Sequence, residues 1–444
     1  MSTLLRVLLR QRNWSYSTFR SHLEKAAREL AETDGTPGLG ALSVSESSYE
    51  RWCAGTVTPQ PDARRVLERL FGFSADELLA PVATPAAPAR GDLGSAAEDD
   101  DSDQHDLKRS AAMAAQRAMK WAMTAESQQV GPETMAHMRE EVHRLAVAYP
   151  RVALGTILDD LVDVQDTIFR ILESGWTKPG QARDLHLLAA LASGILAKAS
   201  HDLGDPVSAM RQARAAYICA DQADHAAARG WIRGLQSLVA YWAGRPEDAA
   251  HYARSGEAAT PQDTGTVRVW LAGLQARAAA VLGDADGMSA AIRKGEDARD
   301  RVQLDDLDAI GGLVTFPYVR ELYYTAEAEV LLPGATPTAE QRAVAAVAAY
   351  ESADRADWAY GDEAGARTNL ALARISGDQL DGAAEAIRPV LDLPTGQRTA
   401  GIVISAQRVH RALAETPSRN ALPARELRVE IEAFAAAPAR TLSR

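Results

Sequence analysis

The sequence contains very little cysteine, with only Cys53 and Cys219 in 444 residues. The two thiols stand far apart and form none of the paired spacings that hold zinc, so we expect neither a disulfide framework nor a zinc site. No run of about twenty apolar residues is present, and Arg6, Arg10 and Arg12 interrupt the apolar N-terminus. We therefore expect a cytoplasmic protein with no membrane partner.

Residues that favour strands are also scarce. Aromatic residues make up 6% of the chain, and clusters of β-branched residues are sparse. Alanine is abundant, and polar turns separate long segments in which apolar residues recur with helical spacing. These features predict an all-α protein. Because 444 residues exceed what one hydrophobic core usually serves, we expect several domains or an extended repeat array.

The sequence lacks the signatures of an active site as well. The glycine cluster at 35–40 has a proline inside it and follows a predicted helix, so it does not fit a phosphate-binding loop. His137 and His143 are six residues apart, which does not place them on one helical face at ligand spacing. No Ser/His/Asp or Cys/His set can be nominated. We expect no enzymatic activity, no cofactor and no resident metal.

The sequence has no excess of basic residues, since its net charge is −12. The acidic residues are, however, unevenly distributed along the chain. Residues 1–79 contain ten basic and ten acidic residues, whereas residues 80–106 contain one arginine against seven acids. This second segment combines proline, alanine and consecutive carboxylates, which predicts a disordered linker over 80–106. A metal site in the acidic run is the alternative, although consecutive carboxylates are more typical of a solvated spacer.

The segment 1–79 has the pattern of a small helical domain. Two predicted helices carry their apolar residues on one face, Leu4, Leu5, Leu8 and Leu9 in the first and Phe19, Leu23, Ala27 and Leu30 in the second. In a third helix, Tyr49 and Trp52 are three residues apart and are expected to anchor it to the core. A capping box could begin at Ser43 or at Ser47, so the predicted start of this helix is uncertain by one turn.

Three motifs follow one another in this segment: Ser45-Glu46-Ser47-Ser48-Tyr49-Glu50-Arg51-Trp52-Cys53-Ala54-Gly55, then Pro59-Gln60-Pro61, then Leu70-Phe71-Gly72-Phe73-Ser74-Ala75-Asp76-Glu77-Leu78. The series resembles the Xre-type helix-turn-helix of actinobacterial regulators that carry a C-terminal tetratricopeptide-like domain, the Streptomyces-type regulators of differentiation and antibiotic production. The resemblance implies a regulator of development or secondary metabolism that is often negative. It also implies that the repeat domain senses a signal or binds a partner.

The predicted DNA contacts lie on and after the third helix. A recognition helix presents its N-terminal side chains to base edges while basic residues hold phosphates. The candidates are Glu46, Ser47, Ser48, Glu50, Arg51, Arg64 and Arg65. Arg51 is the natural base or phosphate contact, and a carboxylate such as Glu50 can accept a hydrogen bond from cytosine. The alternative is a domain that is retained for protein interaction or dimerisation, because its neutral charge supplies little non-specific affinity for DNA.

Short glycine-centred turns recur beyond residue 183, at Gly204, Gly244, Gly283, Gly334 and Gly377, separated by 40, 39, 51 and 43 residues. Each turn is expected to end one helix and begin the next, with glycine as the left-handed cap. Small residues fall where the two helices of a tetratricopeptide hairpin would touch, namely Ala197, Ala209 and Ala216, followed by Ser237 and Ala249. The pattern predicts a series of helical hairpins.

We therefore expect an α-solenoid of divergent tetratricopeptide-like hairpins over 184–436. Connecting helices over 107–183 precede it, predicted at Leu107 to Gln128, Glu133 to Ala148 and Val152 to Glu173, and a tail over 437–444 follows it. A generic α-solenoid or helix bundle is the alternative, because the repeats exceed the usual length of about thirty-four residues.

Stacked hairpins form a concave groove lined mainly by the first helix of each pair, and such grooves bind peptides or partner proteins. Counting back from the hairpin glycines selects a set of lining candidates on one side of the array: Lys198, His201, Arg233, Trp270, Arg277, Tyr324 and Arg367. The alternative is that Trp270 and Tyr324 pack inside the array and that the basic residues are solvated.

The two parts together predict a DNA-binding transcriptional regulator. Residues 1–79 would bind an operator, and residues 184–436 would bind a peptide, small-molecule or protein signal. Because one small domain reads few base pairs, we expect a homodimer on paired half-sites. The competing hypothesis is a tetratricopeptide scaffold that sequesters another regulator and does not touch DNA.

Overall fold

The computed structural model describes residues 2–11, 14–34, 36–71, 73–82, 111–119, 130–175, 177–260, 265–334 and 338–436. The described chain is helical almost throughout, which confirms the predicted all-α class. It divides into two compact units, Met1–Leu107 and Lys108–Arg444. Most of the predicted linker, residues 83–106, and the predicted tail over 437–444 lie outside the described residues.

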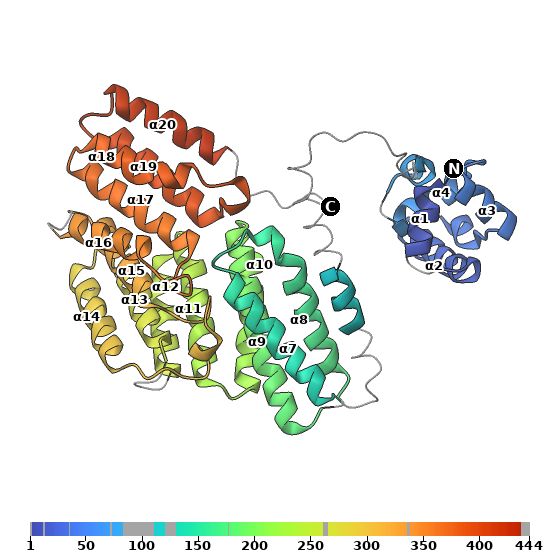
Figure 1. Ribbon diagram of the computed structural model, residues 1–444, viewed down its shortest axis with the longest axis horizontal. Coiled ribbons are helices and arrows are strands. Elements are labelled where there is room, and N and C mark those ends of the chain that lie inside the picture. The colour runs from blue at the N-terminus through green and yellow to red at the C-terminus, as the bar shows by residue number, and fades with distance from the viewer. Residues whose placement is uncertain are drawn as a thin grey trace, which may run out of the picture. The chain divides into compact units, whose positions relative to one another are not determined.

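The described residues of the first unit form five helices, a 3-10 turn and two strands of two residues each (Figure 1). The elements are β1 (Ser2–Thr3), α1 (Leu4–Gln11), α2 (Tyr16–Asp34), η1 (Pro37–Ala41), α3 (Glu46–Ala54), α4 (Pro61–Phe71), α5 (Ala75–Leu79) and β2 (Pro81–Val82). The strands pair antiparallel, with Ser2 opposite Val82. This pairing joins the two ends of the described unit and extends it past the predicted boundary at residue 79.

The core of the first unit contains the apolar faces that the sequence predicts. Leu5, Phe19 and Leu23 are completely buried, and Trp52 of α3 joins the same cluster. Tyr49 is half-buried, and its ring centroid lies 5.2 Å from that of Phe19. These rings therefore hold one face of α3 to the core, and Glu46, Ser47, Glu50 and Arg51 are left exposed.

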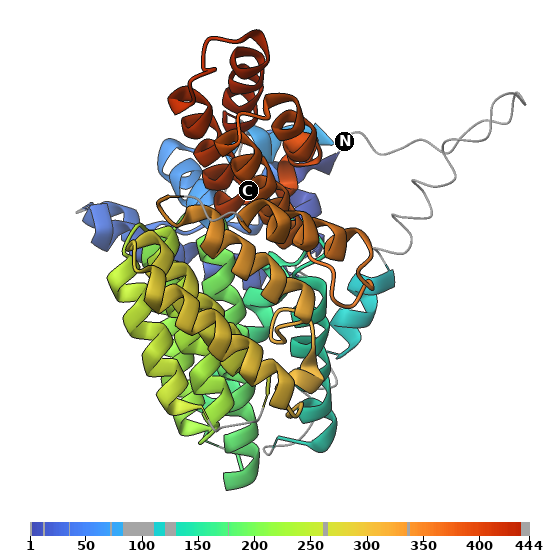
Figure 2. The same cartoon turned by 90° about the vertical axis from the view of Figure 1, so that its left-hand side faces the viewer.

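The second unit begins with a helical segment at 111–119 and continues through fourteen labelled helices, which Figures 1 and 2 show stacked side by side. The early elements are α7 (Pro132–Ala148), η2 (Leu154–Thr156), α8 (Leu158–Glu173), α9 (Pro179–Asp202), α10 (Pro206–Gln222), α11 (Ala226–Trp242), α12 (Pro246–Ala259) and α13 (Val267–Val281). The later elements are α14 (Ala285–Arg301), η3 (Asp308–Ile310), α15 (Tyr318–Leu331), α16 (Ala339–Glu351), α17 (Tyr360–Ser376), α18 (Leu380–Leu391), η4 (Thr395–Gln397), α19 (Ala400–Glu415) and α20 (Leu422–Ala435).

Consecutive helices from α9 onward pack as pairs: α9 with α10, α11 with α12, α13 with α14, α15 with α16, α17 with α18 and α19 with α20. The first helices of these pairs also pack on one another in order, α9 on α11, α11 on α13, α13 on α15, α15 on α17 and α17 on α19. One layer of the unit therefore consists of first helices. The predicted connecting helices α7 and α8 pack on α9 and belong to the same compact unit.

Glycine in the left-handed conformation ends several of the first helices, because a side chain would be strained there. Gly204, Gly244 and Gly283 have φ values of 82°, 72° and 74°. At the last predicted turn the expectation was wrong, since Gly377 has a φ of −88° and Asp378 takes the left-handed conformation, with a φ of 56°. An aspartate tolerates this conformation better than most residues, because its short side chain forms local hydrogen bonds.

Small residues allow the paired helices to approach closely, as predicted. Ala197, Ala209 and Ala216 are completely buried in the first repeated pair. In the next pair, the Ser237 hydroxyl donates a 2.8 Å hydrogen bond to the Ala249 carbonyl oxygen, which satisfies a hydroxyl group buried between α11 and α12.

Candidate functional site

Two adjoining cavities lie among the first helices of the second unit. The first encloses about 620 Å³ and the second about 490 Å³, counting the open space at each mouth. They share seven lining residues: Lys198, Asp202, Leu238, Tyr324, Gly361, Asp362 and Thr399. A molecule in one cavity therefore contacts the walls of the other.

The structure brings five of the seven predicted groove residues to these cavities. Trp270 lines the first cavity, His201 and Arg277 line the second, and Lys198 and Tyr324 line both. These side chains come from α9, α13 and α15, which are all first helices of their pairs. Trp270, Arg277 and Tyr324 are also buried. Each of these side chains therefore both packs inside the array and lines a cavity.

Arg233 and Arg367 do not line either cavity. The Arg233 guanidinium lies over the Tyr217 ring, 4.0 Å from its centroid. Arg367 pairs with Glu363 at 2.8 Å and with Glu351 at 3.1 Å. Helical spacing placed these two residues on the expected helices but did not identify the side chains that hold them elsewhere.

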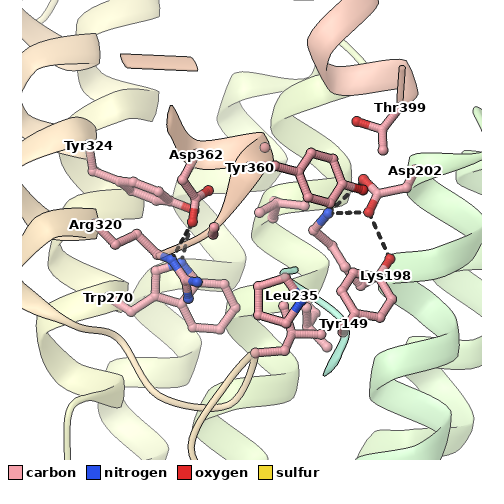
Figure 3. Close-up of a pocket in the computed structure, with 15 residues that line it drawn as sticks. Tyr149, Lys198, Asp202, Leu235, Trp270, Arg320, Tyr324, Tyr360, Asp362 and Thr399 are labelled. Atoms are coloured by element: carbon pink, nitrogen blue, oxygen red, sulfur yellow. Dashed lines mark hydrogen bonds and ion pairs between the residues drawn. The ribbon is translucent and has the colours of Figure 1, made fainter. Parts of the chain in front are cut away.

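One wall of the first cavity is an ion pair on α9 (Figure 3). Lys198 Nζ lies 2.6 Å from both carboxylate oxygens of Asp202, and the Tyr149 hydroxyl donates to Asp202 Oδ2 at 2.7 Å. Burial and the neighbouring carboxylate hold the pKa of Tyr149 well above its usual value. Tyr149 therefore stays protonated and donates to Asp202 throughout the physiological pH range.

A second ion pair lies on the opposite side of the first cavity, with Leu235 between the two pairs in Figure 3. Arg320 Nε of α15 donates to Asp362 Oδ2 of α17 at 2.6 Å, and Arg320 Nη1 donates to the Thr315 carbonyl oxygen at 3.0 Å. Burial acts to lower the pKa of Arg320, but the Asp362 carboxylate and the neighbouring Tyr350 and Tyr324 together outweigh it, so the pKa is raised. The charges that line this cavity are therefore balanced pair by pair.

Apolar and aromatic side chains form the remaining walls of the first cavity. They are Pro150, Leu235, Leu238, Trp270, Leu313, Tyr324, Ala359 and Tyr360. Trp270 Nε1 donates to the Tyr324 hydroxyl at 3.2 Å, which satisfies the indole N–H. A Cβ at Gly234 would lie 2.5 Å from the Trp270 ring, so the absence of a side chain there makes room for the indole.

The second cavity reaches a cluster of buried charges. Arg277 is 1% exposed, and its guanidinium lies over the rings of Tyr241 and Tyr324, 4.3 Å from each centroid. Its Nη2 lies 2.9 Å from Glu327 Oε2, and Arg408 Nη1 lies 3.1 Å from Glu327 Oε1. Burial acts to raise the pKa of Glu327, but the two guanidinium groups lower it, so the carboxylate is ionised.

Some donors of Arg277 have no hydrogen-bond acceptor among the described residues. Arg277 Nε is buried without an acceptor, and the Nη2 contact with Glu327 is an ion pair whose geometry makes no hydrogen bond. Leaving a buried donor unsatisfied costs about 1–3 kcal/mol, more for a charged group. Such a cost marks Arg277 as a group that a bound acceptor would stabilise.

His201 contributes no charge to the second cavity near neutral pH. It is 5% exposed, and burial lowers its pKa to about 4 although Asp202 acts to raise it. Lys198 and Arg277 add to the lowering. The imidazole is therefore neutral at pH 7 and can act only through hydrogen bonding and packing.

Sequence reasoning missed Tyr149, Asp202, Arg320, Tyr360 and Asp362. The spacing of four residues between Lys198 and Asp202 is a visible signal for an ion pair on one helix. No comparable signal links Arg320 with Asp362, because they are 42 residues apart and meet only when α15 packs on α17.

The predicted DNA contacts form a second candidate surface, in the first unit. On α3, Glu46, Ser47, Glu50 and Arg51 are exposed and Ser48 is half-buried. Both predicted capping boxes were wrong: Ser45 is the N-cap, and its hydroxyl accepts from the Ser48 amide. Ser43 instead donates to Glu24 Oε1 at 2.9 Å, which removes it from the start of the helix.

The basic candidates of the first unit differ in how they are held. Arg51 Nε donates to the Ser47 carbonyl oxygen at 3.1 Å, so its side chain follows its own helix. Arg64 of α4 pairs with Asp76 at 2.9 Å, and a phosphate would have to compete with that carboxylate. Arg65 is exposed on the same helix.

Within the described residues, no group of three or more His, Cys, Asp or Glu side chains is arranged to hold a metal ion. No described helix is both long enough and apolar enough to cross a membrane. Comparison of the chain with protein-family models, with curated proteins and with solved structures finds no match.

Proposed function

We propose that the protein is a DNA-binding transcriptional regulator whose helical unit binds a signal. The observation that carries this proposal is the exposed polar surface of α3. Tyr49 and Trp52 fix one face of the helix to the core, and Glu46, Ser47 and Arg51 remain exposed on the other. A short helix held in this way suits insertion into the major groove, which is wide enough to admit a helix.

The proposed fold of the first unit is the Xre-type helix-turn-helix, with α3 as the recognition helix. The N-cap at Ser45 supports this assignment, because it puts Glu46, Ser47 and Ser48 in the first turn, where a recognition helix contacts base edges. Arg51 and Arg65 would contact phosphates or bases, and Arg64 would do so on leaving Asp76. We propose a homodimer, because one such unit reads only a few base pairs.

The proposed fold of the second unit is an α-solenoid of divergent tetratricopeptide-like hairpins. Its support is the packing of paired helices and the ordered packing of their first helices from α9 to α19. A solenoid presents its first helices to one binding surface, and the two cavities lie among these helices. The unit would hold the signal there and alter operator binding by the first unit.

The resemblance of the first unit to actinobacterial regulators supports a cellular role. We propose that the protein acts in the cytoplasm on genes of development or secondary metabolism, as a negative regulator. This role follows the resemblance of the motifs from Ser45 to Leu78 and is separate from the physical argument for DNA contact.

The test is selection of duplexes from fragmented genomic DNA of the source organism by the full-length protein. The proposal expects enrichment of a few sequences, a loss of binding in Arg51→Glu, and unchanged binding in the control Arg28→Glu. Arg28 is an exposed arginine of the same unit that lies on α2 rather than α3. Affinity should also fall steeply with added salt, because phosphate contacts release counterions.

Equal retention of all fragments by the wild type and Arg51→Glu would contradict the proposal. That result would favour the scaffold hypothesis, in which the helical unit sequesters another regulator. The scaffold hypothesis further expects a chain of residues 108–444 to keep the full biological effect.

A further inference from the structure

The charged side chains around the two cavities do not balance. The cations that line the cavities are Lys198, Arg277 and Arg320, and the carboxylates that line them are Asp202 and Asp362. Behind the second cavity, Glu327 pairs with Arg277 and also with Arg408, and neither Glu327 nor Arg408 lines a cavity. Lys198 pairs with Asp202 and Arg320 pairs with Asp362, whereas Arg277 and Arg408 share Glu327. Four cations against three carboxylates leave one positive charge, in a protein with a net charge of −12.

The excess charge belongs to the second cavity. Arg277 lines that cavity, is almost completely buried, and has a buried Nε without a hydrogen-bond acceptor. The guanidinium lies over the rings of Tyr241 and Tyr324, 4.3 Å from each centroid, and these contacts restrict its movement. A fixed guanidinium with unused donors is a preformed site for a carboxylate, which matches its planar geometry.

The first cavity suits a different part of the same molecule. Its charges are paired one to one, and most of its other walls are leucine, proline and aromatic rings. Because the cavities share seven lining residues, one ligand can place an apolar body in the first and a charged end in the second. The excess positive charge would repel an organic cation. A doubly charged phosphate carries more negative charge than this excess neutralises, and the carboxylates of Asp202 and Asp362 would repel the remainder.

We propose that the helical unit binds a small amphipathic organic acid, with its carboxylate on Arg277 in the second cavity and its apolar body between Leu235, Leu238 and Trp270 in the first. The inference rests on the proposed signal-binding role of this unit and names the class of signal. It does not depend on whether the first unit binds DNA.

The test is calorimetric titration of the full-length protein, without DNA, with three acids and their primary amides: 4-phenylbutyrate, indole-3-propionate and octanoate. The proposal expects saturable binding of at least one acid, with affinity at least about tenfold above that of its amide, since each 1.4 kcal/mol is a factor of ten. Equal affinity of acid and amide would overturn the assignment of a carboxylate site. Absence of saturable binding by all three acids at millimolar concentration would also overturn it.

Two variants locate the acid. Arg277→Gln leaves Arg408 and Glu327 as a one-to-one pair, so the buried charge stays balanced and the variant is expected to fold. It should lose at least about tenfold in affinity for the acid and little for the amide. Leu238→Trp fills the boundary of both cavities without changing a charge, and it should block acid and amide alike.

Arg233→Gln is the matched control, because Arg233 is an arginine of the neighbouring helix α11 that stacks on Tyr217 and lines neither cavity. Its affinity for the acid should equal that of the wild type. Loss of acid binding in Arg233→Gln but not in Arg277→Gln would contradict the proposed site. DNA selection is measured separately, so intact operator binding without acid binding would overturn only the class of signal.

Discussion

In the first unit, the described buried side chains are apolar apart from Thr3, whereas the helical unit buries Arg277, Arg320, Glu321 and Glu327. The first unit therefore presents its charged groups on its surface, as a domain that reads another molecule's surface would do. The helical unit places charge and aromatic rings around cavities. Burying ions costs more than burying apolar groups of the same size, so such charges indicate a requirement other than stability alone.

The two cores differ in size but are expected to be independent. Among the described residues, Trp231→Ala removes the largest nearly completely buried side chain of the helical unit, and Phe19→Ala removes a completely buried ring of the first unit. Each should lower the stability of its own unit by about 3–5 kcal/mol. Hydrogen exchange of the full-length protein checks this. For Trp231→Ala we expect faster exchange in residues 130–260 but not in 14–82. For Phe19→Ala we expect faster exchange in 14–82 but not in 130–260. Faster exchange in both ranges for either variant would show that the units unfold together.

Buried and exposed ion pairs should respond very differently to the loss of a carboxylate. Glu327→Gln leaves Arg277 and Arg408 without a carboxylate partner among the described residues, and we expect a loss of about 4 kcal/mol in the free energy of unfolding. Asp76→Asn breaks the exposed Arg64 pair of the first unit and should have little measurable effect. Urea unfolding of both variants measures the two losses of unfolding free energy. Equal losses would contradict the expected difference between buried and exposed ion pairs.

Acid should destabilise the helical unit through His201. Its pKa is about 4 in the folded protein against an ordinary value of 6.5, so the unfolded chain binds the proton first as the pH falls. The stability that neutral His201 allows is fully present above pH 6.5, and the free energy of unfolding decreases by about 3 kcal/mol as the pH approaches 4. His201→Leu should remove this contribution. The free energy of unfolding of the wild type and of His201→Leu is measured at pH 4.5, 5.5 and 7. A difference between the two proteins that does not change with pH would contradict a role for His201.

The smallest stability effect is expected on the exposed surface of α3. Arg51→Glu should change the free energy of unfolding by no more than about 0.5 kcal/mol, because the side chain is exposed. The same change should abolish selection of duplexes. A large loss of stability would mean that Arg51 supports the fold, and its effect on DNA binding could then not be assigned to contact with DNA.

Local patterns in the sequence predict much of the helical unit. Apolar spacing gives its helices, glycines mark most of its turns, and counting back from them reaches five residues that line the cavities. Contacts between distant helices could not be predicted, because Arg320 meets Asp362 and Arg277 meets Glu327 only through tertiary packing. The choice of N-cap on α3 was also missed, since Ser43, Ser45 and Ser47 all fit a helix start. In the structure Ser43 bonds to Glu24, and the Ser45 hydroxyl accepts from the Ser48 amide.

The most direct test of the central claim is genome-wide occupancy of the wild-type protein, of Arg51→Glu and of Arg28→Glu, expressed at equal levels in the source organism. We expect discrete sites that are occupied by the wild type and Arg28→Glu and are empty in Arg51→Glu. Identical profiles for all three proteins, or no enriched site for any of them, would contradict a regulator that reads DNA through α3.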